Sequence, residues 1–505
     1  MCGIFISNNP SVNSDSLSII ESCLKFRGPD ASSGLVSHLG WYAYHSRLSI
    51  IDINSGVNQP IIDSADGILV FNGEILNYKE LGVKYFECDY TSDSKLLSDL
   101  LATGQMNPNE LDGFFAFVYI DNNGKLINAC RDRFGVKPLF YHVDGDYISF
   151  SSEPKVFKEL FDLSVNNHAI EEYYATRAPI FSGSFFTNVN SVDPGHCLKA
   201  GKYFDCTEHL SGCYETVTDK ELEESMKKGI TTRLISDAPV GLLLSRGIDS
   251  NLMKELGDFK RYYTIGFNGD EDIEYLKSNP IEGLSVVECQ AKEYLDSFDY
   301  LLELRGEPMS VPNEVLLYRV ATVAANDGIK VLLSGEGADE FFGGYDRVFK
   351  WAASASAFDL DAFLNLYCYK PPKRNSELYK KFYNLFNSKS FKSVFETVRW
   401  FFIRYHMPVL FRRLDFALMA AGIEGREPIA NHHVFEFAVK LSKHDLMGEE
   451  LGKIPLRKLI EKYLGTEFAF EKKVGFPVDL TQVFDNPEGL SSYDLWFREN
   501  LKVLQ

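Results

Sequence analysis

The chain has 505 residues, of which 45% are hydrophobic and 24% charged, a composition typical of a folded protein rather than a disordered one. This length exceeds what one ordinary hydrophobic core supports, so two domains are expected. The formal net charge of −19 disfavours a nucleic-acid partner and a polybasic contact with a membrane.

The hydropathy pattern and the cysteines indicate the compartment. No uninterrupted apolar segment of about 20 residues predicts a membrane-spanning helix, and the N-terminus lacks the basic and apolar regions of a secretory signal. The 9 cysteines form an odd set without a Cys-x-x-Cys pair, which disfavours a metal cluster and a disulfide framework. We therefore expect a cytoplasmic protein with reduced thiols.

Cys2 follows the initiator Met1 directly. If Met1 is removed, as is usual before a small residue, Cys2 carries a thiol nucleophile and a free α-amine that can act as its base. The ordinary pKa values are about 7.7–8.0 for the amine and about 8.5 for the thiol, so proton exchange between them is feasible at neutral pH. The alternative is a small apolar residue that begins a buried strand.

Short β-type runs broken by Gly, Asn and Asp dominate residues 1–205. They include 68–71, 114–120 and 147–150, and the turn sequence 121–124 separates two strands. This pattern predicts stacked, mostly antiparallel sheets with a few helices.

A polar linker is expected at 206–215, and the pattern changes in residues 216–505. Short buried strands there run into turns that contain Gly and Ser, as in the βα units of a parallel sheet. The predicted strands are 240–244, 262–267 and 329–333. From about residue 350 onward, the spacing of Phe, Tyr and Leu predicts mainly helices.

Polar residues in the first half supply what the hydrolysis of a primary amide requires. Asn72 and the N–H of Gly73, expected just after a strand, provide two donors for a tetrahedral oxyanion. Arg47, expected to begin an apolar strand, suits the carboxylate of a free amino acid. Glu74 and Asp93, the latter at the start of a helix, suit its ammonium group. Taken singly, each residue is more typical of a surface or structural role.

Two strand-turns in the second half suit a bound nucleotide. Residues 241–250 run from a buried strand through a Ser/Gly turn into a helix, where backbone N–H groups can hold phosphate and Asp249 can bind Mg²⁺. Residues 332–340 place three carboxylates beside two glycines, and a metal–nucleotide complex would balance their repulsion. The alternatives are a turn that binds nothing and a solvated acidic loop.

The segments MCGIF, RGPD, HSRLSIID, FNGEILNY, TSDS and CRDRFGVKPLFY together resemble the class II glutamine amidotransferase domain of glutamine-hydrolysing asparagine synthetases. The resemblance implies an α+β N-terminal nucleophile (Ntn) αββα sandwich over residues 1–205. It implies that Cys2 is the nucleophile and that Asn72 and Gly73 form the oxyanion hole. The implied glutamine-binding residues are Arg47, Ile51, Asn72, Gly73, Glu74 and Asp93.

The second half resembles the α/β parallel-sheet ATP-pyrophosphatase domain of the same family, with a helical C-terminal part, over residues 216–505. The resemblance implies ATP and Mg²⁺, with the metal on Asp249 and Asp339, and a homodimer. Glu336 would act in the acyl-adenylate step, and Lys473 in the segment KKVGFP would neutralise charge on the phosphates. The implied ATP contacts are Leu243, Ser245, Gly247, Asp249, Ser250, Ile265, Ser334 and Gly335.

Three segments depart from the family pattern. Arg246 stands where the family has a second Gly of Ser-Gly-Gly; a positive φ there would cost about 1–3 kcal/mol, whereas another φ would allow Arg246 to contact phosphate. The family's D-R-x-S-M appears as 415–419, and its F-L-D appears as 429–431. The last two departures are expected near the site of the acid to be amidated.

These observations give three functional hypotheses. The first is the conversion of L-aspartate, L-glutamine and ATP into L-asparagine, L-glutamate, AMP and pyrophosphate through an acyl-adenylate. The second keeps this chemistry for a sugar acid, a peptide or a natural-product acid, and is motivated by Phe416, Leu418 and Asn431. The third is a nucleotide-sensing or scaffold protein with an active glutaminase and an impaired synthetase, and is motivated by Arg246.

Overall fold

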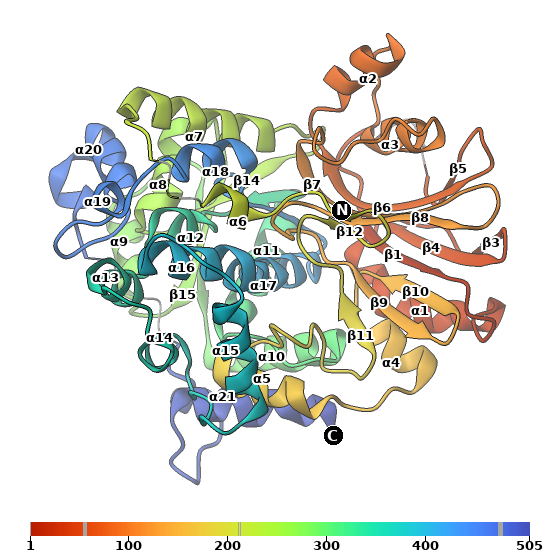
Figure 1. Ribbon diagram of the computed structural model, residues 1–505. Helices are drawn as coiled ribbons and strands as arrows, with labels where there is room; N and C mark the ends of the chain where they lie inside the picture. The colour runs from red at the N-terminus through yellow and green to blue at the C-terminus, as the bar shows by residue number, and fades with distance from the viewer. Residues whose placement is uncertain (1, 54–57, 211, 213, 473–477) are drawn as a thin grey trace.

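The computed structural model describes residues 2–53, 58–210, 212, 214–472 and 478–505. Three β-sheets organise the chain: two antiparallel sheets formed within the first 202 residues, and one parallel sheet between residues 240 and 426. Figure 1 shows the first two sheets together on one side, with the C-terminal helices gathered on the other. No helix among the described residues is long and apolar enough to cross a membrane.

The first sheet has the strand order β11-β9-β10-β1-β4-β2, with β3 also paired to β4. Its central strand β1 begins at the predicted nucleophile and pairs antiparallel with both β10 and β4. The strands are β1 (Cys2–Ser7), β2 (Ala31–Ser32), β3 (Val36–His38), β4 (Trp41–Arg47), β9 (Phe140–Asp144), β10 (Tyr147–Ser151) and β11 (Val189–Ser191).

The second sheet has the order β13-β12-β8-β7-β6-β5 and is also antiparallel. The predicted turn at 121–124 joins β7 to β8, and Gly124 adopts the positive φ of +74° that this turn requires. The strands are β5 (Ile61–Ile62), β6 (Ile68–Ile75), β7 (Gly113–Ile120), β8 (Leu126–Arg131), β12 (His196–Cys197) and β13 (Gly201–Lys202).

The two sheets pack face to face because alternate residues of their strands are apolar. Ile4 and Ile6 of β1 share a buried cluster with Val70 of β6 and Val118 of β7, whereas Phe5 packs on the outer face of its sheet. That outer face is covered by α1 (Leu17–Leu24) and α4 (Lys155–Phe161), and the second sheet packs against α2 (Tyr78–Phe86) and α3 (Asp93–Ala102). The result is an αββα sandwich.

The third sheet is parallel throughout, in the order β16-β15-β14-β17-β18. Helices α7 (Asp219–Arg233) and α8 (Ile248–Leu256) cover one face, while α11 (Asn313–Asn326) and α17 (Met407–Met419) cover the other. This arrangement is the α/β architecture that was predicted. The strands are β14 (Val240–Leu243), β15 (Tyr262–Phe267), β16 (Leu284–Cys289), β17 (Val331–Leu333) and β18 (Glu424–Arg426).

The C-terminal part is mainly helical, as the aromatic spacing predicted. Phe363, Phe386 and Phe401 pack there with ring centroids 5.1–5.5 Å apart. The longer helices of this region are α13 (Asp346–Ser354), α14 (Leu360–Tyr367), α15 (Glu377–Asn387), α16 (Val394–Phe401), α20 (Ile454–Ala469) and α21 (Ser492–Leu501).

Three local expectations were wrong. Arg47 ends β4 instead of beginning a strand, and the residues from Asn72 to Glu74 lie inside β6 instead of after it. Cys130 and Cys197 form a disulfide, so the expectation of reduced thiols fails for this pair. The reason is the sheet register, which sets the two residues directly opposite each other on β8 and β12.

Candidate active sites

The predicted nucleophile is the first residue of β1, an interior strand of the first sheet. Cys2 is 8% exposed, and its backbone nitrogen donates a hydrogen bond to Oδ1 of Asn72 over 2.9 Å. This nitrogen is the one that would become the α-amine after removal of Met1. Burial raises the pKa of the Cys2 thiol, so a nearby base is needed to form the thiolate.

The predicted oxyanion hole has a free donor. Nδ2 of Asn72 is buried and has no hydrogen-bond partner among the described residues, while the same amide's Oδ1 holds Cys2. Gly73 has a φ of +136°, and a Cβ there would lie 2.1 Å from the carbonyl oxygen of Phe114. Only glycine fits this turn of the strand, directly after the residue whose side chain contacts Cys2.

Arg47 lies directly opposite Cys2 in the β1–β4 register. Its Nη2 donates to the carbonyl oxygens of Ile51 over 3.5 Å and Asp52 over 2.9 Å. The predicted residues Arg47 and Ile51 are therefore in contact, at the Cys2 end of the sheet. Arg47 keeps other guanidinium donors for a substrate carboxylate.

Glu74 and Asp93 form a buried pair of carboxyl groups. Burial raises the pKa of Glu74 and raises that of Asp93 to about 6, partly offset at Asp93 by the backbone N–H of Ile75, 3.0 Å from its Oδ2. Oε2 of Glu74 is buried without a hydrogen-bond partner among the described residues. An incoming ammonium group would satisfy that oxygen and favour the ionised carboxylates.

Replacing Asn72 with alanine tests the oxyanion role. We expect kcat for glutamine hydrolysis to fall by about 10²–10³-fold, the usual cost of losing one such donor. The matched control is Asn77→Ala. Oδ1 of Asn77, like that of Asn72, accepts a hydrogen bond from a backbone N–H, that of Asp112, over 3.0 Å. Equal glutaminase rates in the Asn72 variant and the wild type would exclude Asn72 from the oxyanion hole.

A second site lies at the carboxyl ends of the parallel strands β14 and β17, where ligands of open α/β sheets usually bind. A cavity of about 360 Å³ opens there. Every residue predicted for ATP lines it, together with two residues predicted for the chemistry. These are Leu243, Ser245, Gly247, Asp249, Ser250, Ile265, Ser334, Gly335, Glu336 and Asp339.

The loop between β14 and α8 is held by its own side chains. Oγ of Ser250 accepts from the N–H of Ser245 over 3.1 Å, and Oγ of Ser245 accepts from the N–H of Gly247 over 3.1 Å. Nδ2 of Asn251 donates to the carbonyl oxygens of Ser245 and Gly247, both over 2.9 Å. The loop is thereby fixed at the N-terminus of α8, the end of a helix that favours phosphate.

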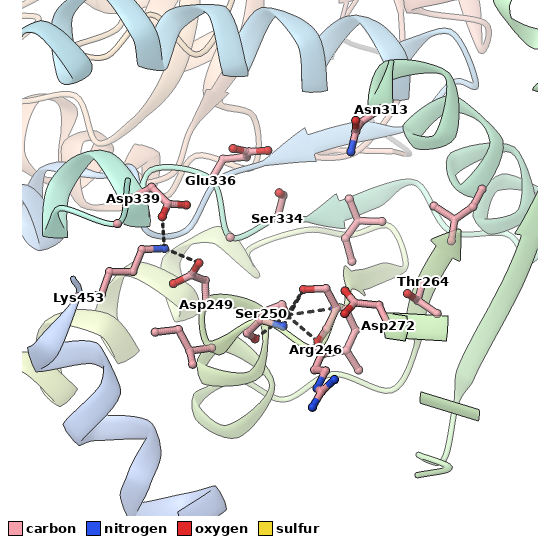
Figure 2. Close-up of a pocket in the computed structure, with 18 of the residues that line it drawn as sticks. Arg246, Asp249, Ser250, Thr264, Asp272, Asn313, Ser334, Glu336, Asp339 and Lys453 are labelled. Carbon is pink, nitrogen blue, oxygen red and sulfur yellow. Dashed lines mark hydrogen bonds and ion pairs between the residues drawn. The ribbon is translucent and has the colours of Figure 1, made fainter. Parts of the chain in front are cut away.

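Lys453 lies between the two predicted metal ligands, as Figure 2 shows. Its Nζ is 2.7 Å from Oδ2 of Asp249 and 2.7 Å from Oδ1 of Asp339. Oδ1 of Asp249 is buried without a hydrogen-bond partner among the described residues, so it has a lone pair free for a cation. Two carboxylates converging on one positive charge fit the oxygen ligands that Mg²⁺ prefers.

Glu336 forms an ion pair with Arg413 of α17. Both residues line the cavity, as does Asn313 at the start of α11. Three lining residues were not predicted from the sequence, because they lie in or just before helices far from the two strand-turns and no local pattern marks them. They are Lys453, Arg413 and Asn313. Lys473 lies outside the described residues, so its predicted role stays a prediction.

Arg246 replaces the family's glycine in the phosphate loop without backbone strain, since it is not among the described residues with positive φ. Its guanidinium pairs with Glu471 and lies 4.8 Å from the ring centroid of Tyr275. In Figure 2 the guanidinium points away from Lys453 and Asp249. Arg246 therefore links the loop to the segment before residue 473 instead of reaching the carboxylates.

We expect Arg246→Gly to change the KM for ATP by no more than about five-fold, because a partly exposed ion pair contributes only about 0–1 kcal/mol. ATP–pyrophosphate exchange at varied ATP concentration measures this change. Glu471→Gln is the matched control, because it removes the same ion pair from the other side. A loss of ATP binding in Arg246→Gly alone would show that the guanidinium contacts the nucleotide.

The departures at Phe416, Leu418 and Asn431 do not line the cavity. Phe416 and Leu418 are fully buried, and Phe416 packs edge-on against Phe26 at 5.7 Å. Asn431 caps α18 (His432–Ala438) by accepting from the N–H of Val434 over 3.1 Å. These side chains therefore serve packing and capping, and their place near the acceptor stays a prediction.

The family models agree with this two-site architecture. A model described as asparagine synthase matches residues 221–499, more than half of the chain, and one described as a glutamine amidotransferase domain matches residues 1–208. The chain belongs to the asparagine synthase family. The predicted family and fold class are confirmed: an Ntn-type glutamine amidotransferase sandwich followed by an α/β synthetase fold. This family member is a ligase for glutamine-dependent amide synthesis.

Three relatives show the extent of the similarity. A Methanocaldococcus jannaschii protein assigned as glutamine-hydrolysing asparagine synthetase 2 is 29% identical over 399 residues, covering 68% of this chain and 76% of the relative. Asparagine synthetase 1 of Bacillus subtilis is 29% identical over 347 residues, covering 63% and 54%. Asparagine synthetase 3 of the same organism is 26% identical over 525 residues, covering 90% and 82%.

Proposed function

We propose that this chain makes L-asparagine from L-aspartate, with glutamine as the nitrogen donor and ATP as the activating substrate. The observation that carries the choice of acceptor is the Arg413–Glu336 ion pair at the nucleotide cavity. One cation and one anion side by side suit the α-carboxylate and ammonium of an α-amino acid, and a sugar acid has no ammonium for Glu336.

In the first site, the α-amine of processed Cys2 takes the thiol proton, and the thiolate attacks the side-chain amide of glutamine. Asn72 and Gly73 donate to the oxyanion, while Arg47 holds the carboxylate and Glu74 with Asp93 hold the ammonium group. The protonated amine then supplies the proton that lets ammonia leave, and water hydrolyses the resulting γ-glutamyl thioester to glutamate.

In the second site, the β-carboxylate of aspartate attacks the α-phosphate of ATP and pyrophosphate leaves. The loop from Ser245 to Ser250 and the N-terminus of α8 would hold phosphate oxygens, and Lys453 would lie next to them. Mg²⁺ would be held by Asp249 and Asp339 and would balance phosphate charge. Ammonia from the first site then displaces AMP from the acyl-adenylate, protected from solvent so that it stays unprotonated.

ATP–pyrophosphate exchange with a panel of acids tests the acceptor. We expect exchange with L-aspartate and a loss of at least about ten-fold with succinate, which lacks the ammonium group. Arg413→Met should raise the KM for aspartate more than that for ATP. Exchange with a sugar acid but not with aspartate would support the alternative acceptor, and ATP binding without exchange under any acid would support an impaired synthetase.

A further inference from the structure

Asp112, His432 and His433 bring three potential metal ligands together at the junction of the two halves. Asp112 directly precedes β7 of the amidotransferase sandwich, and the two histidines are the first residues of α18 in the synthetase half. One ligand atom from each lies within 4.8 Å of the others. No other group of three such residues is found in the described part of the chain.

The backbone on both sides of the cluster is fixed. The carbonyl oxygen of Asp112 accepts from the N–H of Leu76 over 2.7 Å, and its N–H donates to Asn77 over 3.0 Å. On the other side, Asn431 caps α18, and the carbonyl oxygen of His433 accepts from Ser225 over 3.1 Å. The side chains therefore start from positions that the fold determines independently of their own contacts.

Both imidazoles face the same carboxylate although they are consecutive in sequence. Nδ1 of His432 is 3.6 Å from Oδ1 of Asp112, and Nε2 of His433 is 3.4 Å from Oδ2. The two ring centroids are 3.7 Å apart. A tetrahedral zinc ion with ligands at about 2.0–2.2 Å separates its ligand atoms by roughly 3.3–3.6 Å, so separations within 4.8 Å reach this geometry with side-chain shifts of about 1–1.5 Å at most.

The surroundings of Asp112 favour its ionised carboxylate, which is the form that binds a metal ion. Arg233 donates to Oδ1 of Asp112 over 3.0 Å, which stabilises the carboxylate and leaves Oδ2 toward His433. This is the orienting contact that a ligating carboxylate commonly has.

We propose that Asp112, His432 and His433 form a site for a divalent transition-metal ion, with Zn²⁺ as the first choice, that joins the amidotransferase and synthetase halves. Two imidazole nitrogens and one carboxylate oxygen are a zinc ligand set, and the remaining exposure of 12–20% leaves room for water as the fourth ligand. The site is separate from the residues assigned to glutamine and ATP, and it does not depend on their roles.

Zinc binding to the full-length, chelator-stripped protein tests the site. Isothermal titration should give one strong Zn²⁺ site per chain, and Zn²⁺ should raise the midpoint of thermal unfolding. We expect His432→Ala and His433→Ala each to weaken that affinity by at least about ten-fold. His168→Ala is the matched control, because His168 is 62% exposed and also lies beside a carboxylate, that of Glu171.

Unfolding midpoints measured in excess chelator show whether each variant folds like the wild type, so a loss of zinc affinity can be separated from misfolding. Asp112→Asn provides a third variant with nearly unchanged volume. The proposal is overturned if the wild type lacks a strong site, or if the His432 and His433 variants bind zinc as tightly as His168→Ala. In the second case cysteines or the ATP-site carboxylates hold the ion.

Discussion

Cys2→Ala should abolish glutamine-dependent synthesis and leave ammonium-dependent synthesis intact. The substitution removes the proposed nucleophile, and glutaminase turnover should fall by at least about 10³-fold. Synthesis at the nucleotide site should continue, because none of the residues that line its cavity comes from the amidotransferase sandwich. Glutamate release and asparagine formation from ammonium chloride, measured on the same preparation, check both halves of the prediction.

Cys23→Ala is the matched control, since Cys23 is a free cysteine that is 1% exposed and belongs to the same sandwich. It should lose some stability but retain glutaminase activity. If Cys2→Ala still released glutamate at the wild-type rate, another group would have to be the nucleophile. If ammonium-dependent synthesis failed as well, the defect would lie in folding or in the synthetase half.

The residues of the nucleotide cavity could be predicted because each strand-turn motif carries several nucleotide-binding residues within one short segment. β14 and β17 are adjacent and parallel, so residues following each strand meet at one edge of the sheet. Lys453 could not be found in this way. It lies 204 residues from Asp249 in sequence and reaches the cavity only through the packing of α20 near α8.

Register explains the errors in the first half. The apolar residues after Arg47 suggested a strand, but β4 ends at Arg47 because its pairing with β1 ends at Cys2. Asn72 and Gly73 sit inside β6, where the positive φ of Gly73 turns the backbone without ending the strand. The side chains were identified from the chemistry they supply, whereas their place on the strands depends on partners distant in sequence.

The contact between the halves contains a buried ionic network that the sequence did not predict. Arg27 is fully buried, and its guanidinium donates to Glu153 over 2.6 Å, to Asp415 over 2.8 Å and to the carbonyl oxygen of Cys2 over 3.2 Å. Lys137 and Arg412 complete the network, at 3.4 Å from Asp415 and 3.0 Å from Glu153. Asp415 therefore links α17, the helix that carries Arg413, to Arg27, which also bonds to the backbone of Cys2.

Arg27→Met should destabilise the protein by about 3–5 kcal/mol at pH 7.5, because it leaves two buried carboxylates without one of their cations. Despite burial, neighbouring cations keep the pKa values of Glu153 and Asp415 below their ordinary range in the wild type. Their contribution is present above the ordinary carboxyl pKa and is lost on acidification. The difference between variant and wild type should therefore persist from pH 7.5 to about pH 4 and shrink below that, as urea denaturation down to about pH 3 would show. Lys330→Met, which breaks the half-exposed pair with Asp30 across the same junction, should cost at most about 1 kcal/mol at either pH. A similarly small, pH-independent effect of Arg27→Met would mean that Lys137 and Arg412 suffice to balance both carboxylates.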